Sequence, residues 1–117
     1  MMAASLAHAA ANNWVVSVSI VDDAGILLYL DRVDGAVPMS SEVSFRKART
    51  AALTRLASKV WEDRIKERPV FLKFPDTLPI QGGLPIMYEG QCVGAIGVSG
   101  VQSFEDEQIA AAGIAAL

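Results

Sequence analysis

The sequence predicts one small α/β domain, in which helices and β-hairpins follow the order α-ββ-αα-ββ-α. The chain has 117 residues, close to the commonest domain size, so we expect a single core across residues 1–117. Two pairs of stretches rich in β-branched residues surround short turns, and alanine-rich stretches lie before, between and after these pairs. An ordinary ferredoxin-like sandwich fits this order less well.

The bulk composition favours a soluble protein that associates with copies of itself. Apolar residues make up 52% of the chain, yet no helical apolar run approaches the roughly 20 residues of a membrane span. We therefore expect the excess to be buried in a homo-oligomer and expect no membrane partner. The net charge of −3 is spread along the chain, which argues against nucleic acid as a partner. The start of the chain lacks a basic region typical of a signal peptide, so a cytoplasmic location is expected.

The first part of the chain predicts a helix followed by a hairpin. The alanine-rich segment Met1–Ala11 favours a helix, which Asn12-Asn13 would end. The strands are expected at Trp14–Asp22 and Ile26–Arg32, around an Asp-Ala-Gly turn. In the first strand, valine and isoleucine alternate with serine, which predicts one apolar and one polar face.

The middle of the chain predicts two helices and a long loop. Ser40 or Ser41 is expected to cap a helix that has Glu42 in its first turn and runs to about Ala57. Its apolar side is narrow and alanine-rich, which permits close packing. A shorter helix is expected from Ser58 until Pro69 ends it. The segment Phe71–Gly83 contains two prolines and a glycine pair, and a loop of this length is commonly functional.

The last part of the chain predicts a second hairpin and a final helix. The strands are expected at Leu84–Tyr88 and Gln91–Val98. The pattern Ser103-x-x-Asp106 is typical of a capping box, and the helix is expected over Glu105–Leu117.

Four stretches carry a family resemblance. They are VSIVDDAGILLYLDRVDGA, KARTAA, IQGGLPI, and VGAIGVSGVQSFEDEQIAAAGIAAL. Together, in this order, they resemble the GlcG/HbpS family of haem-binding and haem-degrading-like proteins, which also supplies the C-terminal domain of PduO-type proteins. The resemblance covers nearly the whole chain.

The resemblance implies a profilin-like α/β/α sandwich, with a central antiparallel sheet of about four or five strands. It also implies assembly from dimer to octamer. For function it leaves two classes open. One is a module that binds haem, a corrinoid or another small anionic ligand. The other is a lyase that acts on hydroxylaminobenzoate and releases ammonia, because Ser58–Asp63 is similar to the branch with lyase-type sequences.

We expect the site in a cleft between the Phe71–Gly83 loop and the helix around Glu42–Lys47, with a neighbouring subunit as a further wall. Lys47 and Arg49 are the candidate cations for an anionic ligand. The alternative for Lys47 is a structural ion pair with Glu42, Asp22 or Asp34. Acid–base chemistry, if present, is assigned to Glu42, Lys47 and Glu62.

Backbone groups supply further candidate ligand contacts. Gln81, Gly82 and Gly83 can present backbone N–H groups to a ligand, although a simple turn before a strand explains them equally well. Ser99 and Gly100 come just before a helix start, where anions bind readily.

Ligands for haem iron or other metals are sparse. The chain has one histidine, His8, and one cysteine, Cys92, so a four-ligand zinc site is not expected and no metal site is predicted. For haem, His8 is the first candidate axial ligand, with Cys92 or a tyrosine or methionine as other options. Aromatic residues could line a pocket for a flat ligand, or belong to the core or an interface: Tyr29, Tyr88, Trp61, Phe71 and Phe74.

Overall fold

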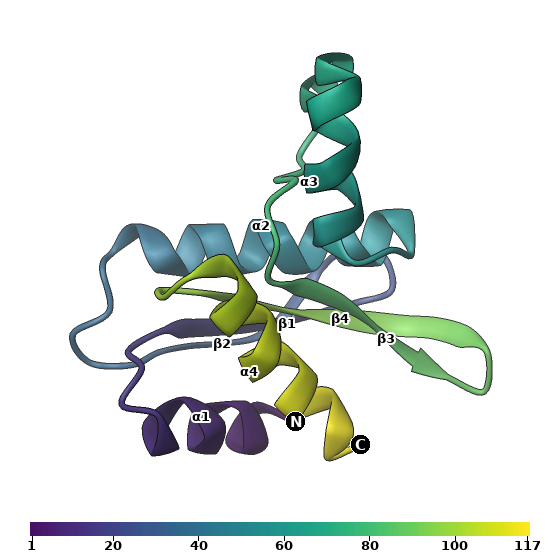
Figure 1. Ribbon diagram of the computed structural model, residues 1–117. Coiled ribbons are helices and arrows are strands. Elements are labelled where there is room, and N and C mark those ends of the chain that lie inside the picture. Colours follow the sequence, from purple (N-terminus) through teal and green to yellow (C-terminus); the bar gives the residue numbers. More distant parts are fainter.

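The computed structural model describes residues 1–117 and forms three layers (Figure 1). A four-stranded antiparallel sheet, in the order β2-β1-β4-β3, has α2 on one face and α1 with α4 on the other. The elements are α1 (Met2–Ala11), β1 (Ser17–Asp22), β2 (Leu27–Arg32), α2 (Met39–Thr54), α3 (Ser58–Glu67), the 3-10 helix η1 (Pro69–Lys73), β3 (Gly83–Tyr88), β4 (Gln91–Ser99) and α4 (Ser103–Ala115). The predicted sandwich and element order are confirmed.

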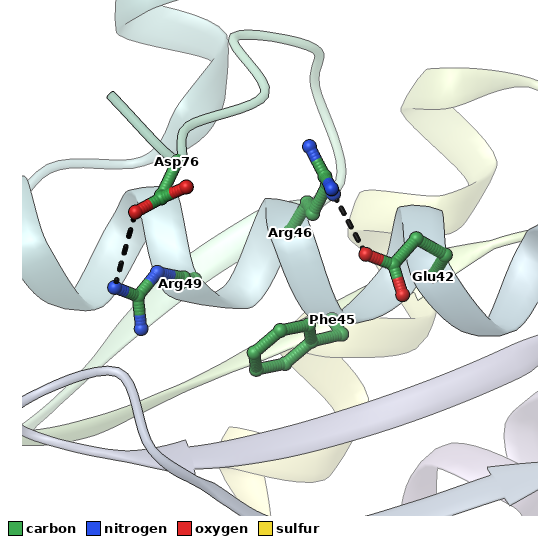
Figure 2. A pocket seen from close by; sticks show the side chains of 5 residues that line it. All are labelled: Glu42, Phe45, Arg46, Arg49 and Asp76. Atoms are coloured by element: carbon green, nitrogen blue, oxygen red, sulfur yellow. Dashed lines mark hydrogen bonds and ion pairs between the residues drawn. The ribbon is translucent and has the colours of Figure 1, made fainter. Parts of the chain in front are cut away.

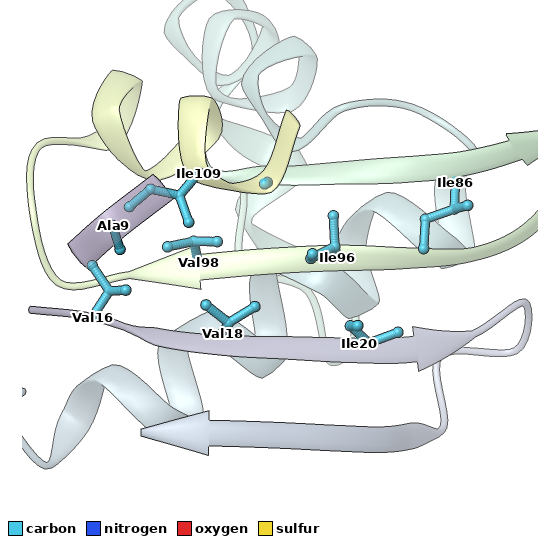
Figure 3. Packing of buried hydrophobic residues seen from close by; sticks show 9 residues of the cluster. Ala9, Val16, Val18, Ile20, Ile86, Ile96, Val98 and Ile109 are labelled. Carbon is cyan, nitrogen blue, oxygen red and sulfur yellow. The ribbon is translucent and has the colours of Figure 1, made fainter. Parts of the chain in front are cut away.

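The larger core lies between the sheet and the helices α1 and α4 (Figure 3). Alternate residues of β1 and β4 point to this face, as the period of two along a strand requires. They meet Ala9 of α1 and Ile109 of α4. The sheet residues of this cluster are Val18, Ile20, Ile86, Ile96 and Val98, and Val16 lies just before β1.

The opposite face of the sheet meets α2 through small side chains. Ser17 and Ser19 of β1 form hydrogen bonds to Ser40 and Ser44 of α2, with O···O distances of 2.8 and 2.7 Å. A Cβ atom on Gly97 of β4 would overlap the α2 backbone. The predicted close packing of this helix is therefore confirmed. Because the serine side chains on both elements are small, their buried hydroxyl groups lie close enough to form hydrogen bonds with each other directly.

The predicted ends of the longest helix were wrong at both sides. The helix α2 begins at Met39 after Pro38, and no side chain caps it. Ser40 lies within its first turn and donates to the carbonyl of Val37 rather than capping. The helix ends at Thr54 because Arg55 adopts the left-handed conformation, with φ of 60°.

Three other boundaries also differ from expectation. The cap of α4 is Gln102 with Glu105, not Ser103 with Asp106; the Asp106 carboxylate accepts from the Val101 N–H instead. The expected loop at residues 71–83 begins inside the 3-10 helix η1. The first strand begins at Ser17 rather than at Trp14.

One buried ion pair connects α2 on one face of the sheet with α4 on the other. The Lys47 ammonium lies 3.0 Å from Asp106 Oδ2 and donates to the carbonyl of Val98 at 3.1 Å. Both side chains are almost fully buried. Burial raises the pKa of Asp106, while the Lys47 charge and the Val101 N–H act in the opposite direction. Removing one partner of such a pair leaves an uncompensated buried charge.

Two glycines make room for this lysine. A Cβ atom on Gly82 would lie 2.9 Å from both Cδ and Nζ of Lys47, and one on Gly83 would overlap the Lys47 carbonyl oxygen. Gly82 also has a φ of +134°, which side chains rarely adopt. The glycine pair of the IQGGLPI stretch thus allows β3 to start directly against α2.

We expect Lys47→Met to destabilise the fold by about 3–5 kcal/mol, because Asp106 then stays buried without its cation. The loss should grow as the pH rises above 3.8, the ordinary pKa of this carboxyl. Without the Lys47 charge, which acts against burial, the folded-state pKa of Asp106 rises further above its ordinary value. Folding of the variant then favours the protonated acid more strongly than folding of the parent does, so the variant loses more stability as the pH rises from the ordinary pKa through the folded-state pKa. Urea unfolding at pH 4 and pH 7 measures both effects.

The matched controls are the exposed Lys66→Met, which should change stability little, and Lys47→Met combined with Asp106→Asn, which should recover part of the loss. A Lys47→Met protein as stable as the parent at pH 7 would show that the ion pair does not hold the layers together.

Candidate functional site

A shallow hollow of about 210 Å³ lies on the outer side of α2 (Figure 2). Its walls are Glu42, Phe45, Arg46 and Arg49 of α2, together with Asp76 from the segment after η1. The four α2 residues are three or four positions apart, so they share one side of the helix. This places the hollow between the helix and the loop that the sequence analysis singled out.

Both arginines of the hollow have solvent-exposed carboxylate partners. Arg46 Nε lies 2.8 Å from Glu42 Oε1, and both side chains are about half exposed. Arg49 donates to the carbonyl of Gly25 at 3.2 Å, and its other terminal nitrogen lies 3.9 Å from Asp76. Exposed pairs of this kind contribute little stability. A ligand carboxylate can therefore take the place of Asp76 at low cost.

The side chains of the hollow suit a flat anion. A guanidinium group offers paired N–H donors that match a carboxylate, and two of them, from Arg46 and Arg49, line the hollow together with the ring of Phe45. An aromatic ring next to cationic donors can contact the face of a flat ligand while the arginines hold its acid group. The two carboxylates, from Glu42 and Asp76, are the only acid–base groups in the walls other than the arginines.

A second hollow of about 500 Å³ is more open and lies near the hairpin turns. Its one cation, Arg55, already donates to the carbonyls of Asp23 and Ala52, at 2.6 and 2.7 Å. Cys92 lies in its wall and donates its thiol hydrogen to Gly94 at 3.3 Å. Because Arg55 serves to hold the end of α2, this hollow offers a ligand less free charge than the first.

The structure separates the two predicted cations. Arg49 lines the hollow on α2, as does Glu42, whereas Lys47 lies in the interior and lines neither hollow. The alternative of a structural ion pair for Lys47 holds, but its partner is Asp106, and the three partners expected from the sequence were wrong. The sequence could not reveal this partner because Asp106 is 59 residues away.

Two of the three backbone N–H groups predicted to face a ligand, those of Gln81 and Gly83, have partners within the chain. The Gly83 N–H donates to the Ser58 hydroxyl at 2.9 Å, and the Gly82 carbonyl accepts from Val98. The Gln81 N–H donates to Glu62 at 3.2 Å. Glu62 also pairs with Lys59, so this candidate acid joins the base of α3 to the loop and does not line the hollow.

The start of α4 is likewise occupied by the chain's own groups. The Gln102 N–H donates to the Glu105 carboxylate, and the Val101 N–H to Asp106. Two acids therefore already satisfy the positive end of the helix. Ser99 and Gly100 end β4 nearby and line neither hollow.

The candidate aromatic residues do not surround one pocket. Trp61 packs against Phe71 and Phe74, with ring centroids 5.4 and 5.3 Å apart, away from both hollows. Tyr29 and Tyr88 are exposed on β2 and β3, at the two edges of the sheet. His8 lies on α1 beside Trp14. Trp61, Phe71 and Phe74 therefore form one cluster, and the two tyrosines lie apart from it at the sheet edges.

Three residues of the hollow were absent from the sequence prediction: Phe45, Arg46 and Asp76. The first two could have been found from their spacing to Glu42 and Arg49 along one helix side. Asp76 could not, because its position depends on the path of an irregular segment.

The structure contains no helix long and apolar enough to cross a membrane. No three histidine, cysteine or acidic side chains come close enough together to hold a metal ion.

The proteins and solved structures that are similar to this chain point to one family. Protein GlcG of Escherichia coli strain K12 is 41% identical over 100 residues, which are 85% of this chain and 75% of GlcG. The crystal structure of a double mutant of Streptomyces reticuli HbpS has a TM-score of 0.93 and 37% identity, and the match covers 98% of this chain and 80% of HbpS.

A further solved structure is a complex of PduOC with haem. It has a TM-score of 0.91 and 28% identity, over 99% of this chain and 88% of that protein. The family model described as "Haem degrading protein HbpS-like" matches residues 1–115. The chain therefore belongs to the HbpS-like family.

Proposed function

We propose that the protein binds a small anionic ligand in the hollow on α2, with haem as the first candidate. The observation that carries this proposal is that Arg46 and Arg49 line one hollow together with the ring of Phe45. Each guanidinium is partly exposed and its carboxylate partner is exposed as well, Glu42 for Arg46 and the more distant Asp76 for Arg49. The haem-bound PduOC structure and the family description support haem over other anions; a corrinoid is the other large candidate.

The residues of the hollow fit one part of haem. Arg46 and Arg49 suit its two propionates, and Phe45 suits the flat ring. The walls offer iron no nitrogen or sulfur ligand, because His8 and Cys92 lie elsewhere. Bound haem supplies redox chemistry at its iron, and this chain's contribution in the hollow is to hold the acid groups.

The size of the hollow favours a site shared between subunits. Its volume of about 210 Å³ is below the 300–1,000 Å³ that enclose a drug-sized ligand. We therefore propose that the protein acts as a homo-oligomer, between dimer and octamer, in which a second copy covers the exposed part of the ligand. The large apolar side chains left exposed on this chain support such assembly.

A hemin titration of variants tests the binding proposal. Arg49→Met should weaken binding at least about tenfold, because a charge-assisted hydrogen bond contributes about 1.5–3 kcal/mol. Arg55→Met removes the same charge from the second hollow and should leave binding unchanged. The measurement is the Soret absorbance against hemin concentration, with circular dichroism to show that each variant is folded. If Arg55→Met weakens binding and Arg49→Met does not, the site is misplaced.

A lyase on a small aromatic acid is the second candidate function. It is favoured by the two carboxylates, Glu42 and Asp76, that share the hollow with the arginines. With 4-hydroxylaminobenzoate, an arginine would hold the substrate carboxylate, and an acid would protonate the departing nitrogen. One water enters, ammonia leaves, and a dihydroxybenzoate remains.

For this alternative, purified protein should release ammonium from 4-hydroxylaminobenzoate, and Glu42→Gln should lower kcat at least about a hundredfold if Glu42 is the proton donor. The ammonium assay is run beside a protein-free control. No ammonium above that control, together with a Soret shift on adding hemin, would leave binding as the function.

A further inference from the structure

Two apolar surfaces of this chain lie exposed at opposite ends of the fold. The first is the arm, which we define as α3 and η1. Only Ser58 of the arm is buried, and the arm stands away from the sandwich (Figure 1). Its helices pack against each other through Trp61 and Phe71, which leaves Val70 and Leu72 exposed. Because so little of this segment is buried, its exposed apolar side chains are available to contact a partner.

The second surface is the edge strand β2. All six of its residues are exposed, and its side chains Leu28 and Tyr29 are 55% and 65% accessible. The strand has one free row of backbone N–H and C=O groups because it pairs only with β1. Natural edge strands are commonly protected by lysine, proline or a covering element. The strand β2 has neither lysine nor proline in its sequence LLYLDR, and its charged side chains, Asp31 and Arg32, stand only at its end.

The arm and the segment around β2 carry opposite charge. The arm, residues 58–73, holds five cations and three carboxylates, a net charge of +2. The strand β2 itself holds one carboxylate and one cation, but residues 22–34, which include the segments on both sides of it, hold four carboxylates and one cation, a net charge of −3. Most of these charges are unpaired within the chain. The ones without an ion pair include Arg64, Arg68 and Lys73 on the arm, and Asp23, Asp31 and Asp34 around β2.

The arm cannot reach the β2 of its own chain. The base of α3 packs on α2 and β3, and β3 and β2 are the two opposite edges of the sheet. We propose that the arm of one copy docks on the β2 edge of a second copy. Apolar side chains meet at the centre of this contact and opposite charges meet around it, which is the usual anatomy of an interface.

The contact joins two different surfaces, so a pair of copies can form it twice around a two-fold axis. This proposal rests on the proposed self-association and is independent of ligand binding in the hollow on α2. It predicts that variants damaged on different surfaces complement each other. An interface made of β2 against β2, or of arm against arm, would not allow that.

The test uses Leu72→Asp on the arm and Leu28→Asp on β2, with Met39→Asp as the matched control. All three replace an exposed apolar side chain. Sedimentation velocity should show at least tenfold weaker association for each of the first two variants, and parent-like association for Met39→Asp. An equimolar mixture of Leu72→Asp and Leu28→Asp should associate more tightly than either variant alone, because one intact contact can form. Circular dichroism verifies that each variant keeps the fold.

Three results would overturn the proposal. A parent chain that is monomeric at micromolar concentration removes self-association altogether. Parent-like association of either Leu72→Asp or Leu28→Asp shows that its surface takes no part. An associated parent whose two damaged variants do not complement each other leaves self-association standing and rules out the contact between arm and edge.

Discussion

The buried pair of Lys47 and Asp106 is the interaction on which the arrangement of this fold depends. It is the point at which α2, β4 and α4 are held together, since the ammonium also binds the Val98 carbonyl. The cost of burying two charges is offset only where geometry and further hydrogen bonds are good. Here the Val101 N–H binds the carboxylate as well. The glycine pair beside the lysine is required because any side chain at Gly83 would overlap the helix backbone.

This constraint also explains how the hollow on α2 is formed. The buried side of α2 is fixed by Lys47, Ser44 and Ala48 against the sheet. Arg46 and Arg49, which lie between them on the helix, therefore lie toward its outer side, whereas the ring of Phe45 stays partly buried against the core cluster on this face of the sheet. The loop that leaves η1 returns over this outer side, where the Leu78 N–H donates to Thr50 at 2.7 Å. The hollow is thus bounded by a rigid helix on one side and an anchored loop on the other.

Local sequence patterns predicted the elements well and their connections less well. The alternation of β1 was sufficient to assign its apolar and serine faces, because a strand has a period of two. The order of elements and the family resemblance together predicted the sandwich. The start of α2 was wrong because a serine near a helix start can bond across the fold instead of capping, as Ser40 does with Ser17. The start of α4 was wrong because Gln102, one residue before Ser103, is the cap. Sequence alone cannot distinguish these uses of a hydroxyl.

The sequence predicted only some of the residues that line the hollow, because it does not show which charged side chains form contacts inside the fold. Arg49 and Glu42 were named because their charges stand on a helix next to a long loop. Lys47 was named with them, and only the fold shows that its charge is directed inward to Asp106. Contacts between residues far apart in sequence decide which charges remain available to a ligand. That information is absent from spacing along one helix.

The most direct test of the ligand hollow is a nuclear magnetic resonance titration of the ¹⁵N-labelled protein with gallium protoporphyrin IX, a diamagnetic relative of haem. The account predicts that the largest amide shift changes fall in residues 42–49 and at Asp76, with changes in the side-chain Nε–H signals of Arg46 and Arg49. Largest changes at residues 87–92 and Arg55 instead, around the second hollow, would contradict it.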